Sequence, residues 1–137
     1  LVDSGELKAP YQGSGLCAQR EAIVKSPDLI MGLVKGLIEA VLIIHDPSHK
    51  QDVMEILKKN LRLAKAEDVE SSYKVLRVQT TLDVAPSLPS WRATQRIVAR
   101  VNPRVGQVDI EQLLEGSFVR SLEESGFLPE MRRRLKD

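Results

Sequence analysis

The segment His45-Asp46-Pro47-Ser48-His49 holds the densest group of metal-binding side chains in the sequence. Imidazoles and carboxylates are ligand types that zinc and other transition metals accept. Pro47 interrupts any helix between the two histidines, so their rings are not expected to share a helical face. The chain has no other histidine, and its single cysteine is Cys17. We therefore predict a turn between two helices at this segment and no metal site.

The candidate nucleophiles also lack partners. Cys17 lies in the apolar run Leu16-Cys17-Ala18, which is typical of a buried small hydrophobe. Gly13-Ser14-Gly15 could present amides to an anion, but it lacks the Lys-Ser/Thr ending of a phosphate loop, and a plain turn is favoured. Gly116-Ser117-Phe118 lacks the second glycine of a nucleophile elbow. Because both histidines lie in one turn, no Ser–His–acid set is expected. We predict no catalytic residues, no cofactor and no enzymatic activity.

Charge is nearly balanced, with 20 basic and 19 acidic residues and a net charge of +1. This balance gives no general field for nucleic acid, and we predict no nucleic-acid partner. Arg132, Arg133, Arg134 and Lys136 form the one basic cluster. It could contact phosphate or a membrane surface, but a solvated helix end is favoured, since cations there suit the helix dipole. By pattern, we expect four carboxylates to face solvent: Glu111, Glu115, Glu123 and Glu124.

The composition is that of a single globular domain of 137 residues, with 42% apolar, 28% charged and 4% aromatic residues. The longest apolar run, Ala40 to Ile44, is far too short to span a membrane. One cysteine permits no disulfide within the chain, so the compartment cannot be read from disulfides. The chain opens Leu1-Val2-Asp3, without Met and without a signal-peptide pattern, which suggests a cut-down chain.

The strongest predicted element is a helix over 27–44. Ser26 is a good N-cap and Pro27 suits the first helical position. Gly32 and Gly36 lie four apart and weaken the helix by ~1 kcal/mol each relative to Ala, so we expect a neighbouring element to approach closely there. The helical period predicts one buried apolar face, through Ile30, Leu33, Val34, Leu37, Ile38, Val41 and Ile44.

The remaining elements follow from turn signals and periodicity. We predict a short strand over 16–22 and helices over 50–61, 67–80 and 90–101, with Ser90 as a cap after a proline-containing loop at 84–89. A further helical pattern runs from about 110 to Gly126, after which Phe127 and Leu128 pack back onto the core. A short last helix spans 129–135. The predicted fold is mostly α, with one short crossover strand and five or six helices.

Four segments of this pattern resemble the solute-binding proteins of ABC importers for nitrate, sulfonates and taurine, a superfamily that includes pyrimidine-precursor binding proteins. They are Tyr11-Gln12-Gly13-Ser14-Gly15-Leu16, then Ser26-Pro27-Asp28-Leu29-Ile30, then Leu37-Ile38-Glu39-Ala40, and the closing segment Ser117-Phe118-Val119-Arg120-Ser121-Leu122-Glu123-Glu124-Ser125-Gly126-Phe127. The closing segment is the most specific match. Tyr73 also falls where the family has a tyrosine, whereas Cys17 and Gly116 depart from its pattern.

The resemblance implies a C-terminal part of a two-lobe α/β fold, the type 2 periplasmic-binding fold. Residues 1–25 would end the second lobe and form the return crossover, and 26–137 would form the C-terminal helical layer of the first lobe. It implies a small solute (a sulfonate, nitrate or a pyrimidine-like molecule), with Tyr11, Gln12 and Ser14 as ligand-binding positions. The full-length protein would be periplasmic or anchored at the cell surface and would deliver solute to an importer permease.

Two alternatives remain open at this point. The chain could be a stand-alone helical interaction or regulatory domain derived from that family, or part of a superfamily enzyme of pyrimidine synthesis, whose His and Cys groups this chain does not show. In the receptor fold these helices would cover a sheet, so the broad apolar stripe of 27–44 would be partly exposed here. We therefore predict that the isolated chain forms a homo-oligomer, a homodimer or an intertwined pair.

Overall fold

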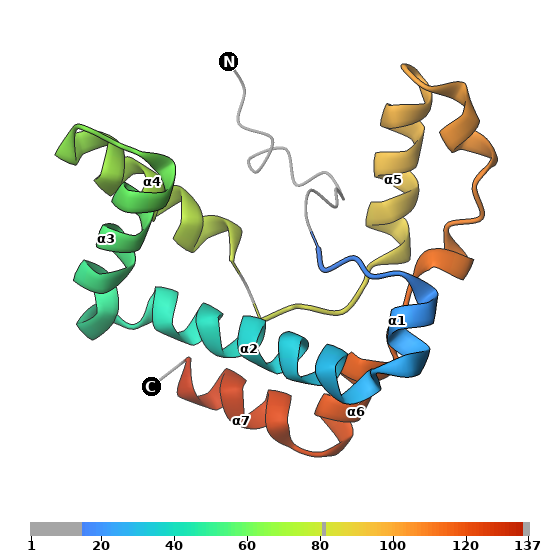
Figure 1. Cartoon of the computed structure of the whole chain (residues 1–137), viewed down its shortest axis with the longest axis horizontal. Coiled ribbons are helices and arrows are strands. Elements are labelled where there is room, and N and C mark those ends of the chain that lie inside the picture. Colours follow the sequence, from blue (N-terminus) through green and yellow to red (C-terminus); the bar gives the residue numbers. More distant parts are fainter. Residues whose placement is uncertain (1–14, 81, 136–137) are drawn as a thin grey trace. The chain divides into compact units, whose positions relative to one another are not determined.

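The structure, a computed structural model, describes residues 15–80 and 82–135. Over these residues it contains seven α-helices, three short 3-10 helices and no β-strand, which confirms the predicted mostly helical fold (Figure 1). The chain divides into two compact units. The "α2 unit" comprises Arg20–Val84 and Phe118–Asp137, and the "α5 unit" comprises Leu1–Gln19 and Ala85–Ser117. Each unit is described by itself.

The predicted crossover strand at 16–22 is wrong. Residues 15–19 have no regular structure, and α1 (Arg20–Lys25) takes up the rest of the segment. A strand needs a partner for its backbone groups, and the described residues offer no second strand. Glu21 and Lys25, four residues apart, form an ion pair of 2.5 Å that suits the helix instead.

The long helix α2 (Pro27–His45) matches its predicted span to within one residue. Ser26 occupies the N-cap position, although its side chain makes no capping bond, and Pro27 lies at the start of the first turn. The helix ends where Asp46 adopts an extended backbone, the conformation that the following Pro47 favours. Its buried residues are Ile30, Ile38 and Val41, whereas Leu33 and Leu37, predicted on the same buried face, are exposed.

A single 3-10 turn, η1 (Pro47–His49), leads into α3 (Lys50–Leu61), which has the predicted bounds. The next helix is α4 (Ala66–Gln79), displaced by one residue from its prediction. The two helices lie side by side in the α2 unit. Lys50 at the start of α3 pairs with Glu70 on α4 at 3.0 Å, and each helix buries apolar residues: Val53, Val69 and Tyr73.

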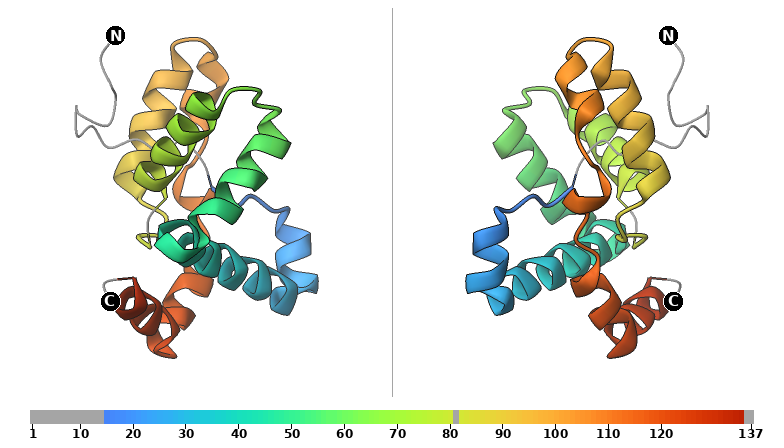
Figure 2. Two further views of the ribbon diagram at one scale, coloured as in Figure 1. Left: turned by 90° about the vertical axis from the view of Figure 1, so that its left-hand side faces the viewer. Right: turned by 90° about the vertical axis from the view of Figure 1, so that its right-hand side faces the viewer.

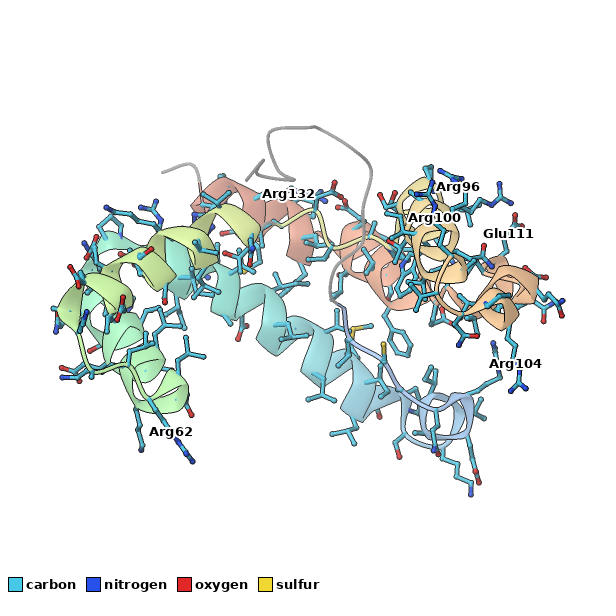
Figure 3. The ribbon with its side chains drawn as sticks, turned by 90° about the horizontal axis from the view of Figure 1, so that it is seen from above. Arg62, Arg96, Arg100, Arg104, Glu111 and Arg132 are labelled. Atoms are coloured by element: carbon cyan, nitrogen blue, oxygen red, sulfur yellow. The ribbon has the colours of Figure 1, made fainter. Side chains whose placement is uncertain are left out.

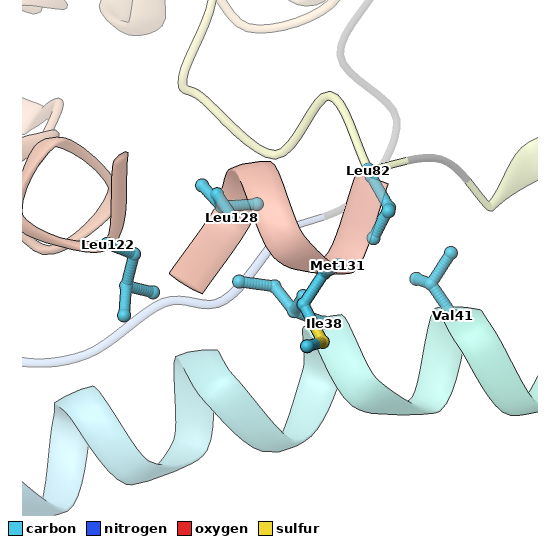
Figure 4. Close-up of a cluster of buried hydrophobic side chains, with 6 residues drawn as sticks. All are labelled: Ile38, Val41, Leu82, Leu122, Leu128 and Met131. Atoms are coloured by element: carbon cyan, nitrogen blue, oxygen red, sulfur yellow. The ribbon is translucent and has the colours of Figure 1, made fainter. Parts of the chain in front are cut away.

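The core of the α2 unit forms where the last two helices, α6 (Ser117–Glu124) and α7 (Phe127–Arg134), meet α2. Gly126 has a φ of +81° and turns the chain between them, a conformation that glycine adopts without strain. Figure 4 shows α7 lying beside α2, and Figure 2 shows the two helices from two further sides. The buried cluster consists of Ile38, Val41, Leu82, Leu122, Leu128 and Met131, with Phe127 packed against it. The prediction that Phe127 and Leu128 pack back onto the core is therefore confirmed.

The α5 unit is built around α5 (Leu88–Ala99), η2 (Pro103–Gln107) and η3 (Glu111–Leu113). The predicted cap Ser90 is wrong, because the helix begins earlier and the side chain of Ser87 accepts the hydrogen bond from the Ser90 amide. Pro89 fits in the first turn, where no amide donor is needed. The continuous pattern expected from about 110 to Gly126 is also interrupted, since residues 114–116 are irregular and include the poor helix former Gly116.

Candidate functional site

The predicted ligand-binding positions Tyr11, Gln12 and Ser14 lie outside the described residues, so they remain predictions. Cys17, in contrast, is described and exposed, and the prediction that it is buried is wrong. The cause is the missing strand: without a sheet, the irregular segment at 15–19 is not covered. The Cys17 thiol lies 3.9 Å from the carbonyl oxygen of Gly15.

The two histidines of the segment 45–49 are directed to different partners. His45 is half-buried, and its Nε2 lies 3.0 Å from the carbonyl oxygen of Thr80. His49 is exposed, with Nδ1 3.5 Å from Oδ2 of Asp52 on α3. Nowhere in the described chain do three His, Cys, Asp or Glu side chains come together as a metal site would require. The predicted turn is confirmed, since α2 ends at His45 and η1 follows.

Asp46 organises this turn. Its Oδ1 accepts hydrogen bonds from the Ser48 hydroxyl at 2.7 Å and from the Ser48 amide at 2.8 Å. These bonds stabilise the ionised carboxylate, the side-chain bond more than the backbone bond, and so lower the pKa of Asp46 from its ordinary value. The positive charge of a protonated His49 acts in the same direction. The arrangement is that of a side-chain-capped turn.

A polar junction joins the C-terminal ends of α2 and α4. The Tyr73 hydroxyl donates to the carbonyl of Ile44 at 3.1 Å, although the tyrosine side chain is otherwise buried. A carbonyl can only accept, so the contact with Thr80 places a proton on Nε2 of His45. The Thr80 hydroxyl donates to Leu76 at 2.8 Å. The junction therefore fixes how α4 meets α2 and offers no group positioned for catalysis.

Seven ion pairs are formed by side chains of the described residues. Arg132 pairs with Glu123 and Arg133 with Glu130, so two arginines of the predicted C-terminal cluster serve neighbouring carboxylates. In the α5 unit Arg92 pairs with Glu111, while Arg96, Arg100 and Arg104 are exposed (Figure 3). Exposed pairs of this kind contribute little to stability.

Three of the four carboxylates expected to face solvent are exposed, namely Glu111, Glu115 and Glu124, whereas Glu123 is half-buried. Glu115 also has a local role, because its Oε1 accepts from the Ser117 amide at 2.8 Å at the start of α6. Glu111 pairs with Arg92 and Glu123 with Arg132, so two of these acids serve ion pairs within their own units.

The outer face of α2 carries large apolar side chains that the described residues leave exposed. Leu29, Leu33 and Leu37 are 63%, 47% and 53% exposed, and each follows the last by one helical turn. A side chain added at Gly32 or Gly36 would meet nothing within 4 Å. The expected close approach of a neighbouring element to these glycines is thus not made by the described chain. We define the outer face by Leu29, Gly32, Leu33, Gly36, Leu37, Ala40 and Ile43.

The shallow depression along α3 is lined by residues of that one helix: Asp52, Glu55, Ile56, Lys59 and Asn60. A depression on a single helix does not surround a ligand as binding sites do. Among the described helices, none has the length and apolar character needed to cross a membrane. The outer face of α2 is therefore the best-defined candidate contact surface.

Comparison of the chain with protein-family models, with curated proteins and with solved structures found no match.

Proposed function

We propose that the chain is the C-terminal portion of a solute-binding protein that captures a small solute for an ABC importer. The observation that carries the proposal is the meeting of two segments that resemble this family. Ile38, in the Leu37–Ala40 segment, is fully buried in one cluster with Leu122 and Leu128 of the closing helices. The resemblance assigns both segments to one helical layer of the first lobe, and their packing in one cluster supports that assignment.

The proposed receptor works by closing two lobes around a solute through a hinge. In that scheme the helices described here form a rigid layer on one lobe, and the ligand contacts come from the crossover. Tyr11, Gln12 and Ser14 are the proposed contacts of this chain, supplying a ring, an amide and a hydroxyl. Such groups suit an anionic or polar solute of the sulfonate, nitrate or pyrimidine type. The receptor would act in the periplasm or at the cell surface, beside its permease.

The first test is the coding sequence upstream of Leu1. A receptor requires an in-frame region of alternating strands and helices that supplies the parallel sheets of both lobes. A start codon immediately before Leu1 would instead favour a stand-alone helical interaction domain, and it would contradict the receptor proposal.

The second test is ligand-dependent thermal stabilisation of the complete gene product. Taurine, nitrate and a pyrimidine serve as probes, and the cognate solute at about 100 times its Kd adds about 2.7 kcal/mol to the free energy of unfolding. Tyr11→Ala or Gln12→Ala should abolish the shift. Gln51→Ala, on the exposed surface of α3, is the matched control and should retain it. If none of the three probe classes raises Tm, the receptor proposal fails for these solutes.

A further inference from the structure

Positive charge gathers at the turn between α3 and α4. Four exposed cations lie within eight consecutive residues there, and we call them the basic turn: Lys58, Lys59, Arg62 and Lys65. None of the residues 56–66 is acidic. Apolar residues separate these cations, so they form no continuous run, and the sequence-based prediction of a single basic cluster at the C-terminus is incomplete. Figure 3 shows the Arg62 side chain extending from the end of α3.

Arg62 occupies a position where the backbone conformation disfavours arginine. Its φ is +54°, and it is the one non-glycine residue with a positive φ in the described chain. This left-handed backbone lets the Leu63 amide donate to the Lys58 carbonyl at 3.0 Å, which closes the end of α3. Glycine is the usual residue at such a helix end, because a Cβ makes the left-handed conformation unfavourable. Local folding therefore does not explain an arginine here.

Lys65 is also placed against local preference. It is the N-cap residue of α4, where the positive end of the helix dipole repels a cation. Its ammonium lies 3.5 Å from the Glu67 carboxylate, but both side chains are at least 70% exposed, so water screens this pair. Lys58 and Lys59, in contrast, lie in the last turn of α3, where the dipole favours them. The helix dipoles thus account for two of the four cations and not for Arg62 and Lys65.

We propose that the basic turn docks on a membrane surface that carries anionic phospholipids. The first argument is charge complementarity. Within the described chain Lys58, Lys59 and Arg62 form no ion pair, so their charges can meet headgroup phosphates without breaking one. The second argument is Leu61, which is 55% exposed among these cations and can enter the headgroup region.

The composition of the turn favours lipid over nucleic acid. Proteins that bind single strands stack aromatic side chains on the bases, and the residues 56–66 include no aromatic residue. Duplex binding depends on many phosphate contacts, and a chain with a net charge of +1 gives no general field for them. A lipid surface requires only a local cluster of cations beside an apolar side chain.

The primary experiment is co-sedimentation of the 137-residue chain with vesicles at low ionic strength. One vesicle contains phosphatidylcholine and phosphatidylglycerol in equal amounts, and the other contains phosphatidylcholine alone. We expect the chain to bind the anionic vesicle, and this binding should weaken as NaCl is raised to about 0.5 M. Equal binding to the two vesicles, or binding to neither, would overturn the proposal. Tighter binding to a DNA duplex than to the anionic vesicle would assign the basic turn to nucleic acid and would also overturn it.

Arg62→Gly separates binding from folding. The substitution relieves the left-handed backbone and should raise Tm by about 2–5 °C. It also removes one cation and should lower the partition coefficient on the anionic vesicle about fivefold. A variant that is more stable and yet binds less cannot owe its loss of binding to misfolding. Arg62→Lys keeps the charge and should bind as the unsubstituted chain does. Undiminished binding by Arg62→Gly would contradict the proposal.

A matched pair of variants separates the basic turn from overall charge. Arg62→Gln and Arg100→Gln each remove one exposed arginine, the second at the end of α5. Arg62→Gln should lower the partition coefficient about fivefold, whereas Arg100→Gln should leave it within about twofold. Equal losses would assign the binding to net charge and overturn the assignment to the basic turn. None of these measurements uses a solute, so lipid docking and the receptor can fail separately.

Discussion

The two units of the chain are stabilised by different means. The α2 unit buries a cluster of aliphatic side chains, of which Ile38, Leu122 and Leu128 are almost fully removed from solvent. In the described part of the α5 unit only Ala93 and Ile110 are buried. Its turns are instead fixed by side-chain hydrogen bonds, above all those of Gln95. Burial of apolar area stabilises a fold in proportion to the area, whereas each hydrogen bond contributes about 1 kcal/mol net.

This difference predicts which unit opens first. Regions with few buried apolar contacts open locally at a lower free energy than packed helices. We therefore expect the α5 unit to exchange its amide hydrogens faster than α2 and α7.

Removing part of Leu128 should cost the most stability. Its side chain is 0% exposed, in contact with the cluster around Ile38. Leu128→Ala leaves a cavity there and should lower the free energy of unfolding by about 2–5 kcal/mol, as buried leucines do. Urea titration followed by circular dichroism measures the change. Leu113→Ala in the α5 unit is the control, since Leu113 is 62% exposed and its truncation should cost at most about 0.5 kcal/mol. Similar losses of unfolding free energy in both variants would contradict the inference that buried apolar side chains stabilise mainly the α2 unit.

Truncating Gln95 should loosen the α5 unit and leave the α2 unit unchanged. Its Nε2 donates to the carbonyl oxygen of Val105 within η2 at 2.8 Å and to that of Val108, directly after η2, at 2.7 Å. Gln95→Ala removes both bonds and should lower the local opening free energy of residues 103–108 by about 1–3 kcal/mol. Hydrogen exchange read by NMR gives this value amide by amide. A matching loss of protection in α7 would show that the two units unfold together.

Capping residues, prolines and apolar periodicity in the sequence predicted the bounds of the long helices well. They did not predict the contacts between residues far apart in the sequence. The span of α2 follows from Pro27, the apolar stripe and the stop at Pro47, and α3 was equally well marked. The bonds from Tyr73 to Ile44 and from His45 to Thr80 join residues 29 and 35 positions apart. No pattern in the sequence relates such residues, because tertiary packing decides which helix ends meet.

The wrong predictions have physical causes of the same kind. Leu16-Cys17-Ala18 is apolar enough for a strand, but a strand forms only where another strand pairs with it, and Cys17 is consequently exposed. Ser90 and Ser87 are both suitable caps, and the tolerance of the first helical turn for Pro89 decided between them. The candidate ligand positions Tyr11, Gln12 and Ser14 rest on resemblance alone, since they precede the described residues.

The turn between α2 and α3 belongs to the α2 unit, but side-chain hydrogen bonds stabilise it, as they stabilise the turns of the α5 unit. The pKa of Asp46 is lowered from its ordinary value, first by the hydroxyl of Ser48 and then by its amide. Because this pKa is lower in the folded state than in the unfolded state, ionised Asp46 stabilises the fold fully above the ordinary pKa near 4. This stabilisation is lost as pH falls through the lower pKa of the folded state. The effect should be the smallest of the three, since Asp46 is exposed.

Carboxyl ¹³C shifts of Asp46 followed by NMR between about pH 2 and pH 6 measure this pKa directly. Ser48→Ala removes the larger of the two hydrogen bonds, so the midpoint should move up toward the ordinary value without reaching it, because the backbone bond remains. Ser71→Ala, on the exposed surface of α4, should leave the midpoint unchanged. A midpoint that stays low in Ser48→Ala would assign the stabilisation to the backbone amide alone. The turn would then depend on the bond between the Asp46 carboxylate and the Ser48 amide and not on the Ser48 side chain. The α5 unit would differ in this respect, because the Gln95 side chain donates the bonds to both Val105 and Val108.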